Sequence, residues 1–129
     1  MARCKVLAFL LCERAAREAD GKVALHGLFD RIIVPRSPAK TKLFFVYYKV
    51  VVEEPCTLSL RVRDSSAREI PGNWRDTLAQ IGPLQAIWAL TSGLFKQPGS
   101  YVLELRQEVE GSEALSLASM LFIVEQQDE

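Results

Sequence analysis

Apolar and polar residues alternate along several stretches of the chain, with the period of two that is typical of β-strands. The pattern is strict in residues 57–63 and 101–106, where one face of each segment is apolar and the other is polar. We expect each of these strands to be buried on one face only, as in an antiparallel sheet with one solvated side. The residues expected to face the core are Leu58, Leu60, Val62, Tyr101, Leu103 and Leu105.

Three further stretches, residues 5–12, 43–52 and 115–124, are apolar on both faces. Aromatic and β-branched residues in the second stretch favour a strand over a helix. A two-sheet sandwich has a single interior layer, so apolar residues that face outward need a cover. Two sources of that cover stay open. One is the same chain, through a short helix and the loop 64–76 with Trp74, and the other is a second subunit.

The remaining pattern completes an all-β domain. Residues Glu13–Ala19 favour a short helix, because glutamate, arginine and alanine are strong helix formers and Asp20-Gly21 follows as a stop. The sequence predicts a single domain over residues 1–129, an immunoglobulin-like antiparallel sandwich of two sheets with about eight to nine strands and this one helix. Further strands, separated by turns at proline and glycine, are expected at residues 22–29, 77–81 and 84–95.

The composition is that of an ordinary soluble domain, with 49% hydrophobic and 25% charged residues. No apolar run approaches the ~20 residues that a membrane-spanning helix requires. The apolar run 6–12 is followed by charged residues without a small-residue cleavage site, so we interpret it as a strand and not as a signal peptide. Three cysteines, an odd number, indicate reduced thiols in a cytoplasmic protein.

Charge is distributed unevenly, although the formal net charge is zero. Residues 31–52 contain five basic residues and no acid, whereas residues 104–129 contain seven acidic residues and one arginine. One interpretation is that the two segments are neighbours that neutralise each other, or are simply solvated. The other is that they form complementary contacts between subunits or with a partner.

Two blocks of the sequence resemble those of a known family. Asp20 to Ile32 (DGKVALHGLFDRI) and Gly93 to Tyr101 (GLFKQPGSY) are similar to recurring blocks of an uncharacterised bacterial family, a domain of unknown function. The resemblance extends over most of the chain and implies a small β-sandwich. It implies no activity, no cofactor and no catalytic residue.

Residues that carry catalysis or bind metals do not occur in recognisable spacings. Cys4 and Cys12 lie on one expected strand, about 26 Å apart at ~3.3 Å per residue, too far to share a metal ion or a disulfide. His26 is the only histidine, and no Gly-x-Ser-x-Gly elbow or phosphate-binding glycine loop is present. We therefore expect no cofactor, no metal and no catalytic residue.

The two-faced strands favour a non-enzymatic binding or assembly module. Such a domain would form a homodimer or bind a protein partner through an apolar sheet face. A dimer or larger species in solution is the corresponding expectation. The residues expected at this interface are Phe9, Phe45, Tyr47, Met120 and Phe122.

The alternative is a small-ligand-binding domain or an enzyme, with a pocket near residues 61–76 lined by arginine and tryptophan. A small anionic ligand would suit such a pocket, because arginine binds carboxylates and phosphates well. Nucleic acid is a poor fit, because acidic residues reduce the net charge of this region to about +1. The residues expected to contact the ligand are Arg36, Arg61, Arg63, Trp74 and Arg75.

Overall fold

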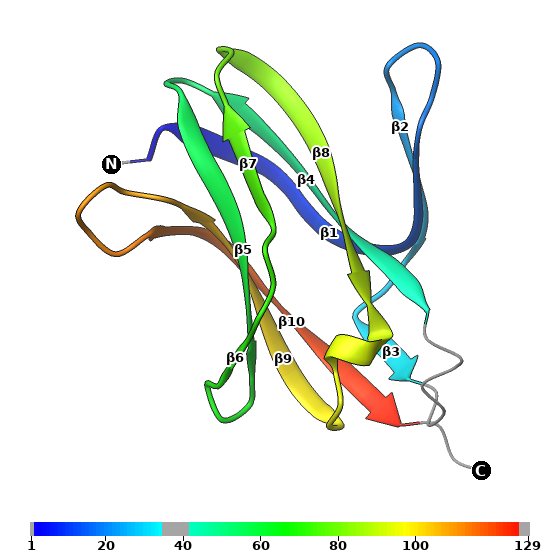
Figure 1. Cartoon of the computed structure of the whole chain (residues 1–129). Coiled ribbons are helices and arrows are strands. Elements are labelled where there is room, and N and C mark those ends of the chain that lie inside the picture. Colours follow the sequence, from blue (N-terminus) through cyan, green and yellow to red (C-terminus); the bar gives the residue numbers. More distant parts are fainter. Residues whose placement is uncertain (1, 35–41, 127–129) are drawn as a thin grey trace.

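Two β-sheets face each other in the computed structural model, which describes residues 2–34 and 42–126 (Figure 1). The first sheet has the strand order β2-β1-β4-β8, and the second has the order β3-β10-β9-β5-β6, with β7 also paired to β5. In the first sheet the bounds are β1 (Cys4–Arg17), β2 (Val23–Leu28), β4 (Leu43–Val52) and β8 (Gly82–Thr91). In the second they are β3 (Arg31–Val34), β5 (Cys56–Asp64), β6 (Glu69–Ile70), β7 (Arg75–Leu78), β9 (Gly99–Gln107) and β10 (Leu115–Gln126).

This architecture confirms the predicted two-sheet, immunoglobulin-like sandwich. Strand pairing within the described residues is antiparallel except between β3 and β10, which run parallel. The core lies between the sheets, and a group of aromatic rings fills one end of it. The ring of Phe95 lies 5.0 Å from that of Tyr101, 5.1 Å from that of Phe122 and 5.6 Å from that of Phe44. All six residues predicted to face the core from β5 and β9 are buried there.

The short helix predicted over Glu13–Ala19 is wrong. The segment is the second half of β1, which pairs with β2 from Cys12 opposite Leu28 to Arg17 opposite Val23. A seven-residue helix is marginal on its own, so pairing with a neighbouring strand overrides the helix propensity of its residues. Within the described residues the helical structure is one 3-10 turn, η2 (Ser92–Leu94). The described residues form ten strands, more than the expected eight or nine, because β3 and β6 are short and carry no alternation.

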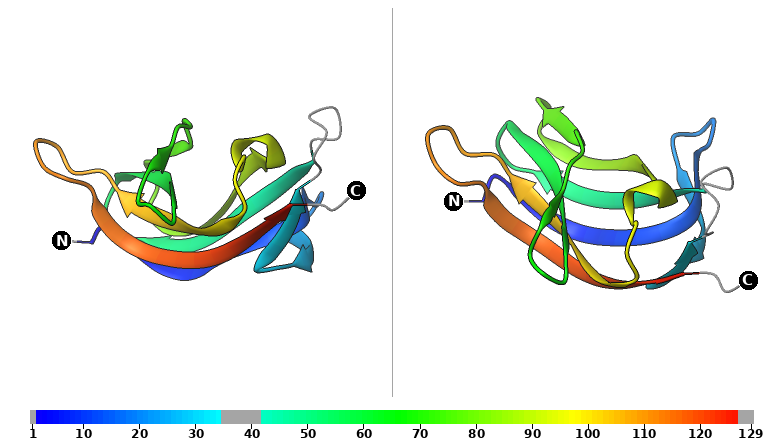
Figure 2. Two further views of the ribbon diagram at one scale, coloured as in Figure 1. Left: turned by 90° about the horizontal axis from the view of Figure 1, so that it is seen from below. Right: turned by 60° about the horizontal axis from the view of Figure 1, so that its bottom comes forward.

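The β1–β2 hairpin stands on the outer side of the first sheet (Figures 1 and 2). After Cys12, β1 leaves β4 and bends away with β2. The guanidinium of Arg17 then donates to the carbonyl of Gln85 on β8 at 3.0 Å. The base of the hairpin helps to bury outward-facing residues of this sheet, since Cys12 is 0% and Tyr47 7% exposed. Part of the second apolar face of β4 is therefore buried within the chain, at Tyr47, whereas Phe45 is half-buried and Leu43 is exposed.

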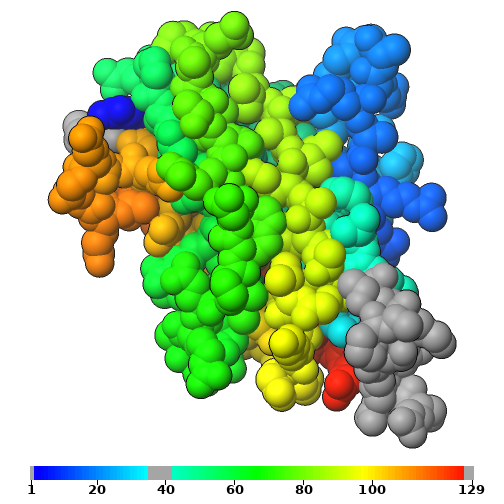
Figure 3. Space-filling model, viewed as in Figure 1, coloured from blue at the N-terminus to red at the C-terminus, as the bar shows by residue number. Residues whose placement is uncertain are grey.

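The hairpin tip stands apart from the rest of the sheet. Figure 3 shows it as an arm separated by a notch from the strands beside it. Arg17 and Gly21 of the hairpin, with Lys49 and Gln85 of the sheet, line a groove of about 500 Å³ at this place. The chain thus covers the outer face of the sheet at the base of the arm and leaves an open groove near its tip.

The long side of the sandwich at β7 and β8 is closed by contacts from Trp74 and from Asp76 of β7 to the first sheet. The indole of Trp74 donates to the carbonyl of Ala89 at 3.1 Å, and the hydroxyl of Tyr48 donates to the Asp76 carboxylate at 2.5 Å. Gly72 lies against the Trp74 ring so closely that a Cβ there would be 1.9 Å from a ring carbon. The segment expected as an irregular loop therefore closes an edge, and Trp74 joins the two sheets.

Candidate functional site

The opposite side of the sandwich has two free strand edges. Residues 4–11 of β1 pair only with β4, and residues 115–122 of β10 pair only with β9, within the described part of the chain. Each strand also carries a register shift, between Val6 and Ala8 in β1 and between Ser116 and Ala118 in β10. Bulges of this kind interrupt the backbone ladder and make an edge a poor template for another strand. A partner on this side would therefore contact side chains more than backbone.

An apolar groove of about 480 Å³ runs along this side, and we call it the seam groove. Its lips are exposed leucines: Leu28 is 61%, Leu121 60% and Leu10 36% exposed. A fourth leucine, Leu7, lies at the β1 bulge and is 51% exposed. The remaining lining residues are Phe9, Leu11, Phe29, Asp30 and Met120.

The link between β2 and β3 builds one end of the seam groove. The amide of Phe29 donates to the carbonyl of Leu11 in the first sheet at 3.3 Å, and the carbonyl of Asp30 accepts from the amide of Ile123 in the second sheet at 2.8 Å. The chain thus crosses between the sheets within a few residues. Gly27 has φ +70°, and a Cβ there would lie 3.0 Å from the side chain of Glu13. Glycine therefore permits both the backbone conformation and the close approach at this crossing.

The structure distributes the five predicted interface residues over three environments. Phe9 and Met120 line the seam groove. Phe45 and Tyr47 lie on the outer face of the first sheet, where Phe45 is half-buried and Tyr47 is buried. The prediction for Phe122 is wrong, because its side chain has no exposed surface and packs among the core aromatic rings.

The most exposed residues of the seam groove were not among the predicted contacts. Leu10, Leu28 and Leu121 form its lips, whereas their neighbours in the sequence are core residues. A strand that is apolar on both faces has no pattern that distinguishes the inner face from the outer one. A possible signal was the leucine at position 28, which stands directly before the sheet crossing.

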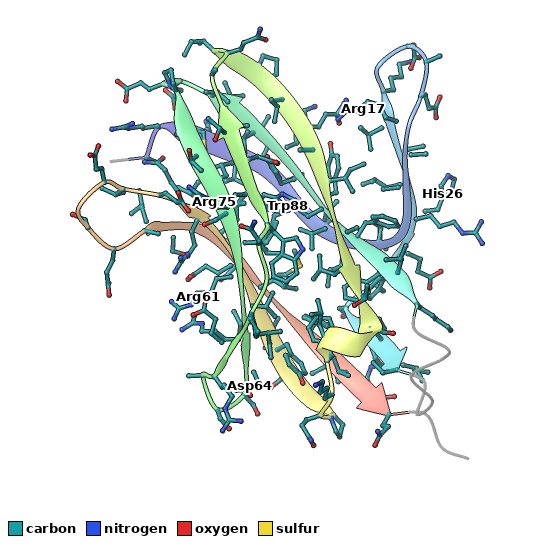
Figure 4. All side chains as sticks on the ribbon, in the orientation of Figure 1. Arg17, His26, Arg61, Asp64, Arg75 and Trp88 are labelled. Atoms are coloured by element: carbon teal, nitrogen blue, oxygen red, sulfur yellow. The ribbon has the colours of Figure 1, made fainter. Side chains whose placement is uncertain are left out.

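The predicted arginine pocket does not form from the described residues. Arg61, Arg63 and Arg75 lie on the outer face of the second sheet, and Figure 4 marks Arg61 and Arg75 there. None of them lines the seam groove or the groove beside the β1–β2 hairpin. Trp74 closes the β7–β8 side, and Arg36 lies outside the described residues.

Each of these arginines has an acidic neighbour. The shortest nitrogen–oxygen distances are 3.7 Å from Arg61 to Glu69, 3.8 Å from Arg63 to Glu104 and 2.6 Å from Arg75 to Glu108. On this face, therefore, basic and acidic side chains lie next to one another along the strands. Exposed ion pairs of this kind contribute little each, and together they make a solvated surface.

The basic and acidic segments of the sequence meet at one point. Arg31 of β3 pairs with Glu125 of β10, which is the neutralisation that one interpretation expected. The acidic residues of β9 instead face arginines from outside the basic segment, as Glu104 does with Arg63 and Arg106. The two segments therefore neutralise each other only in part within the described residues.

The cysteines are free thiols, and two of them meet across the sandwich. Cys4 begins β1, Cys56 begins β5, and their thiols are hydrogen-bonded between the sheets. Burial, and then the neighbouring Cys56, raise the pKa of Cys4 to about 12. No group of three or more potential metal ligands occurs in the described residues. Nor does any helix among them have the length and hydrophobicity to span a membrane.

Comparison with known proteins extends the structural result. Residues 7–118 match a family of unknown function, DUF6941. The chain is similar to the C-terminal domain of wzt, with 9% identity and a TM-score of 0.54, over 100% of this chain and 76% of that one. This likeness shows the fold alone. A weaker likeness, with 14% identity and a TM-score of 0.44, relates 93% of the chain to 88% of the CARDB domain of PF1109 from Pyrococcus furiosus. No curated protein matches the sequence.

Proposed function

We propose that this chain, which belongs to the family of unknown function DUF6941, is a non-enzymatic assembly module that forms a homodimer through the seam groove. The observation that carries the proposal is the row of exposed leucines along the groove. Leu7, Leu10, Leu28 and Leu121 together expose on the order of 400 Å² of apolar surface, a size at which patches on soluble proteins are often functional.

The groove is suited to contact through side chains. Its lips project from three strand segments of both sheets, while its floor consists of partly buried residues such as Phe9, Phe29 and Met120 that pack on the core. A floor held by the core is preformed, so little conformational entropy is lost when a partner docks. The leucine lips of one copy are of the right chemistry to enter the groove of another.

A second copy is the partner that the charge and the area favour. The formal net charge is zero, so two copies approach without long-range repulsion. A stable interface buries about 800 Å² on each partner, of which the apolar row supplies roughly half and its polar surroundings can supply the rest. A two-fold dimer brings the same patch together twice, and the four leucines of the row then meet an apolar surface.

The compartment is part of the proposal. Cys4, Cys12 and Cys56 are free thiols, and thiols persist in the reducing cytoplasm. We therefore propose a cytoplasmic location, and the resemblance of its glycine-containing blocks supports a bacterial origin.

Light scattering on purified protein at micromolar concentration tests the dimer. The wild type should have twice the 14.5 kDa mass of one chain, and the double variant Leu28→Asp, Leu121→Asp should have the mass of one chain. The matched control is Ile81→Asp, because Ile81 is 64% exposed and lies away from the seam groove. A monomeric wild type, or a double variant that stays dimeric while circular dichroism shows native strands, would exclude the proposal.

A further inference from the structure

A second groove, distinct from the seam groove, lies where β1 bends past β3 and the start of β4. Its volume is about 520 Å³, within the range of small-molecule sites. Phe44, 2% exposed, and half-buried Phe29 form its apolar base. Ile33 and Leu43 form its sides and are 54% and 59% exposed, so two large aliphatic residues face solvent at its mouth. We call it the basic groove, for the side chains described next.

Three cations border the apolar surface of the basic groove: Arg14, Arg31 and Lys42. Arg31 pairs with Glu125, whereas Arg14 and Lys42 form no ion pair with a described residue. The groove contains one acidic residue, Glu13, whose side chain lies against Gly27. The site therefore combines an apolar interior with an excess of positive charge at its border.

We infer that the basic groove binds an aliphatic carboxylate, with the alkyl chain along Phe29, Ile33 and Leu43 and the carboxylate at Arg14 and Lys42. Arginine suits this headgroup because its planar guanidinium can donate two parallel hydrogen bonds to one carboxylate. The alkyl chain of the ligand covers the exposed side chains of Ile33 and Leu43. Its carboxylate carries one negative charge, which pairs with Arg14 and Lys42. A neutral lipid would leave these cations unused, and an amine would meet repulsion.

The inference is independent of the dimer, although Phe29 lines both grooves. Its test therefore has to separate the two sites. The variant Leu121→Asp alters the lip of the seam groove and leaves the lining of the basic groove unchanged, so it should keep the ligand. Loss of binding in this variant would place the ligand in the seam groove and overturn the assignment.

Isothermal titration calorimetry of the full chain with decanoate tests the inference, with decanol and decylamine as ligands of the same chain length. Decanoate should bind. Uncharged decanol and cationic decylamine should each bind at least about tenfold more weakly, which is the difference expected for one charge-assisted hydrogen bond. The variants Arg14→Gln and Lys42→Gln should each weaken decanoate by about the same factor. The control Lys22→Gln, which removes an exposed lysine outside the groove, should leave binding unchanged.

Three further results would overturn the assignment. They are the absence of decanoate binding, equal binding of decanol, and unchanged binding in both glutamine variants. A further variant, Leu43→Asp, places a charge on the exposed side of the groove and should abolish binding. Circular dichroism on each variant shows whether the fold is retained, so that a loss of binding reports on the groove itself.

Discussion

Alkaline pH is expected to destabilise the fold through the thiol of Cys4. This side chain is 3% exposed, and its pKa rises from 9.0 to about 12 because of burial and the neighbouring Cys56. The folded protein therefore keeps the proton at pH values where the unfolded chain releases it. The resulting stabilisation is fully present below pH 9 and is lost as the pH rises from 9 to about 12.

The magnitude follows from the linkage between protonation and folding. Each pH unit above the unfolded pKa costs about 1.4 kcal/mol per retained proton, so Cys4 alone removes about 2 kcal/mol at roughly pH 10.5. In Cys4→Ala this contribution is absent, although the smaller side chain lowers the stability at neutral pH by about 1–2 kcal/mol. The stability advantage of the wild type should therefore fall by about 2 kcal/mol at the higher pH, which removes or slightly reverses it.

Urea denaturation of both proteins, at about pH 7.5 and about pH 10.5, measures this difference. Other buried groups also have raised pKa values and lower the stability of both proteins, among them Tyr48, whose pKa is raised mainly by burial and the hydrogen bond to Asp76. Only the change in the difference between wild type and variant reports on Cys4. An equal loss of stability in the two proteins would refute the assigned cause.

Two further substitutions test the β7–β8 side of the sandwich. Gly72→Ala places a Cβ 1.9 Å from the Trp74 ring, so it should cost about 2 kcal/mol and change the near-UV circular dichroism; an unchanged spectrum would contradict this packing. Tyr48→Phe removes the 2.5 Å hydrogen bond to Asp76 and should lower the free energy of unfolding by about 1–2 kcal/mol. A variant as stable as the wild type in urea would show that this bond contributes nothing.

The fold could be predicted wherever a strand has one wet face. In residues 57–63 and 101–106 the alternation identifies both the strand and its buried side, because polar residues mark the outer face. The pattern fails at Glu13–Ala19, where local helix propensity is overridden by pairing with β2. It also fails at β3 and β6, which are too short to show a period and exist because longer neighbours pair with them.

The candidate site could be predicted only in outline. Apolar residues on both faces of β1, β4 and β10 predicted a second apolar surface, and Leu7, Leu10 and Leu121 of β1 and β10 are exposed. The sequence could not show that β1 leaves β4 after Cys12 and turns with β2 into a hairpin, because that depends on where β1 bends. Nor could it distinguish Leu121 from Phe122, which are adjacent apolar residues on opposite faces of one strand. Three-dimensional pairing alone assigns one to the groove and the other to the core.

Photo-crosslinking from the seam groove tests the central claim most directly. Benzoylphenylalanine in place of Leu121 lies on the lip of the groove, and the same substitution at Ile81 is the matched exposed control. The account predicts a crosslinked dimer from position 121 only, with the adduct mapped by mass spectrometry to β1 or β10 of the second copy. An adduct confined to the charged outer face around Arg61, or no dimer adduct from position 121, would contradict it.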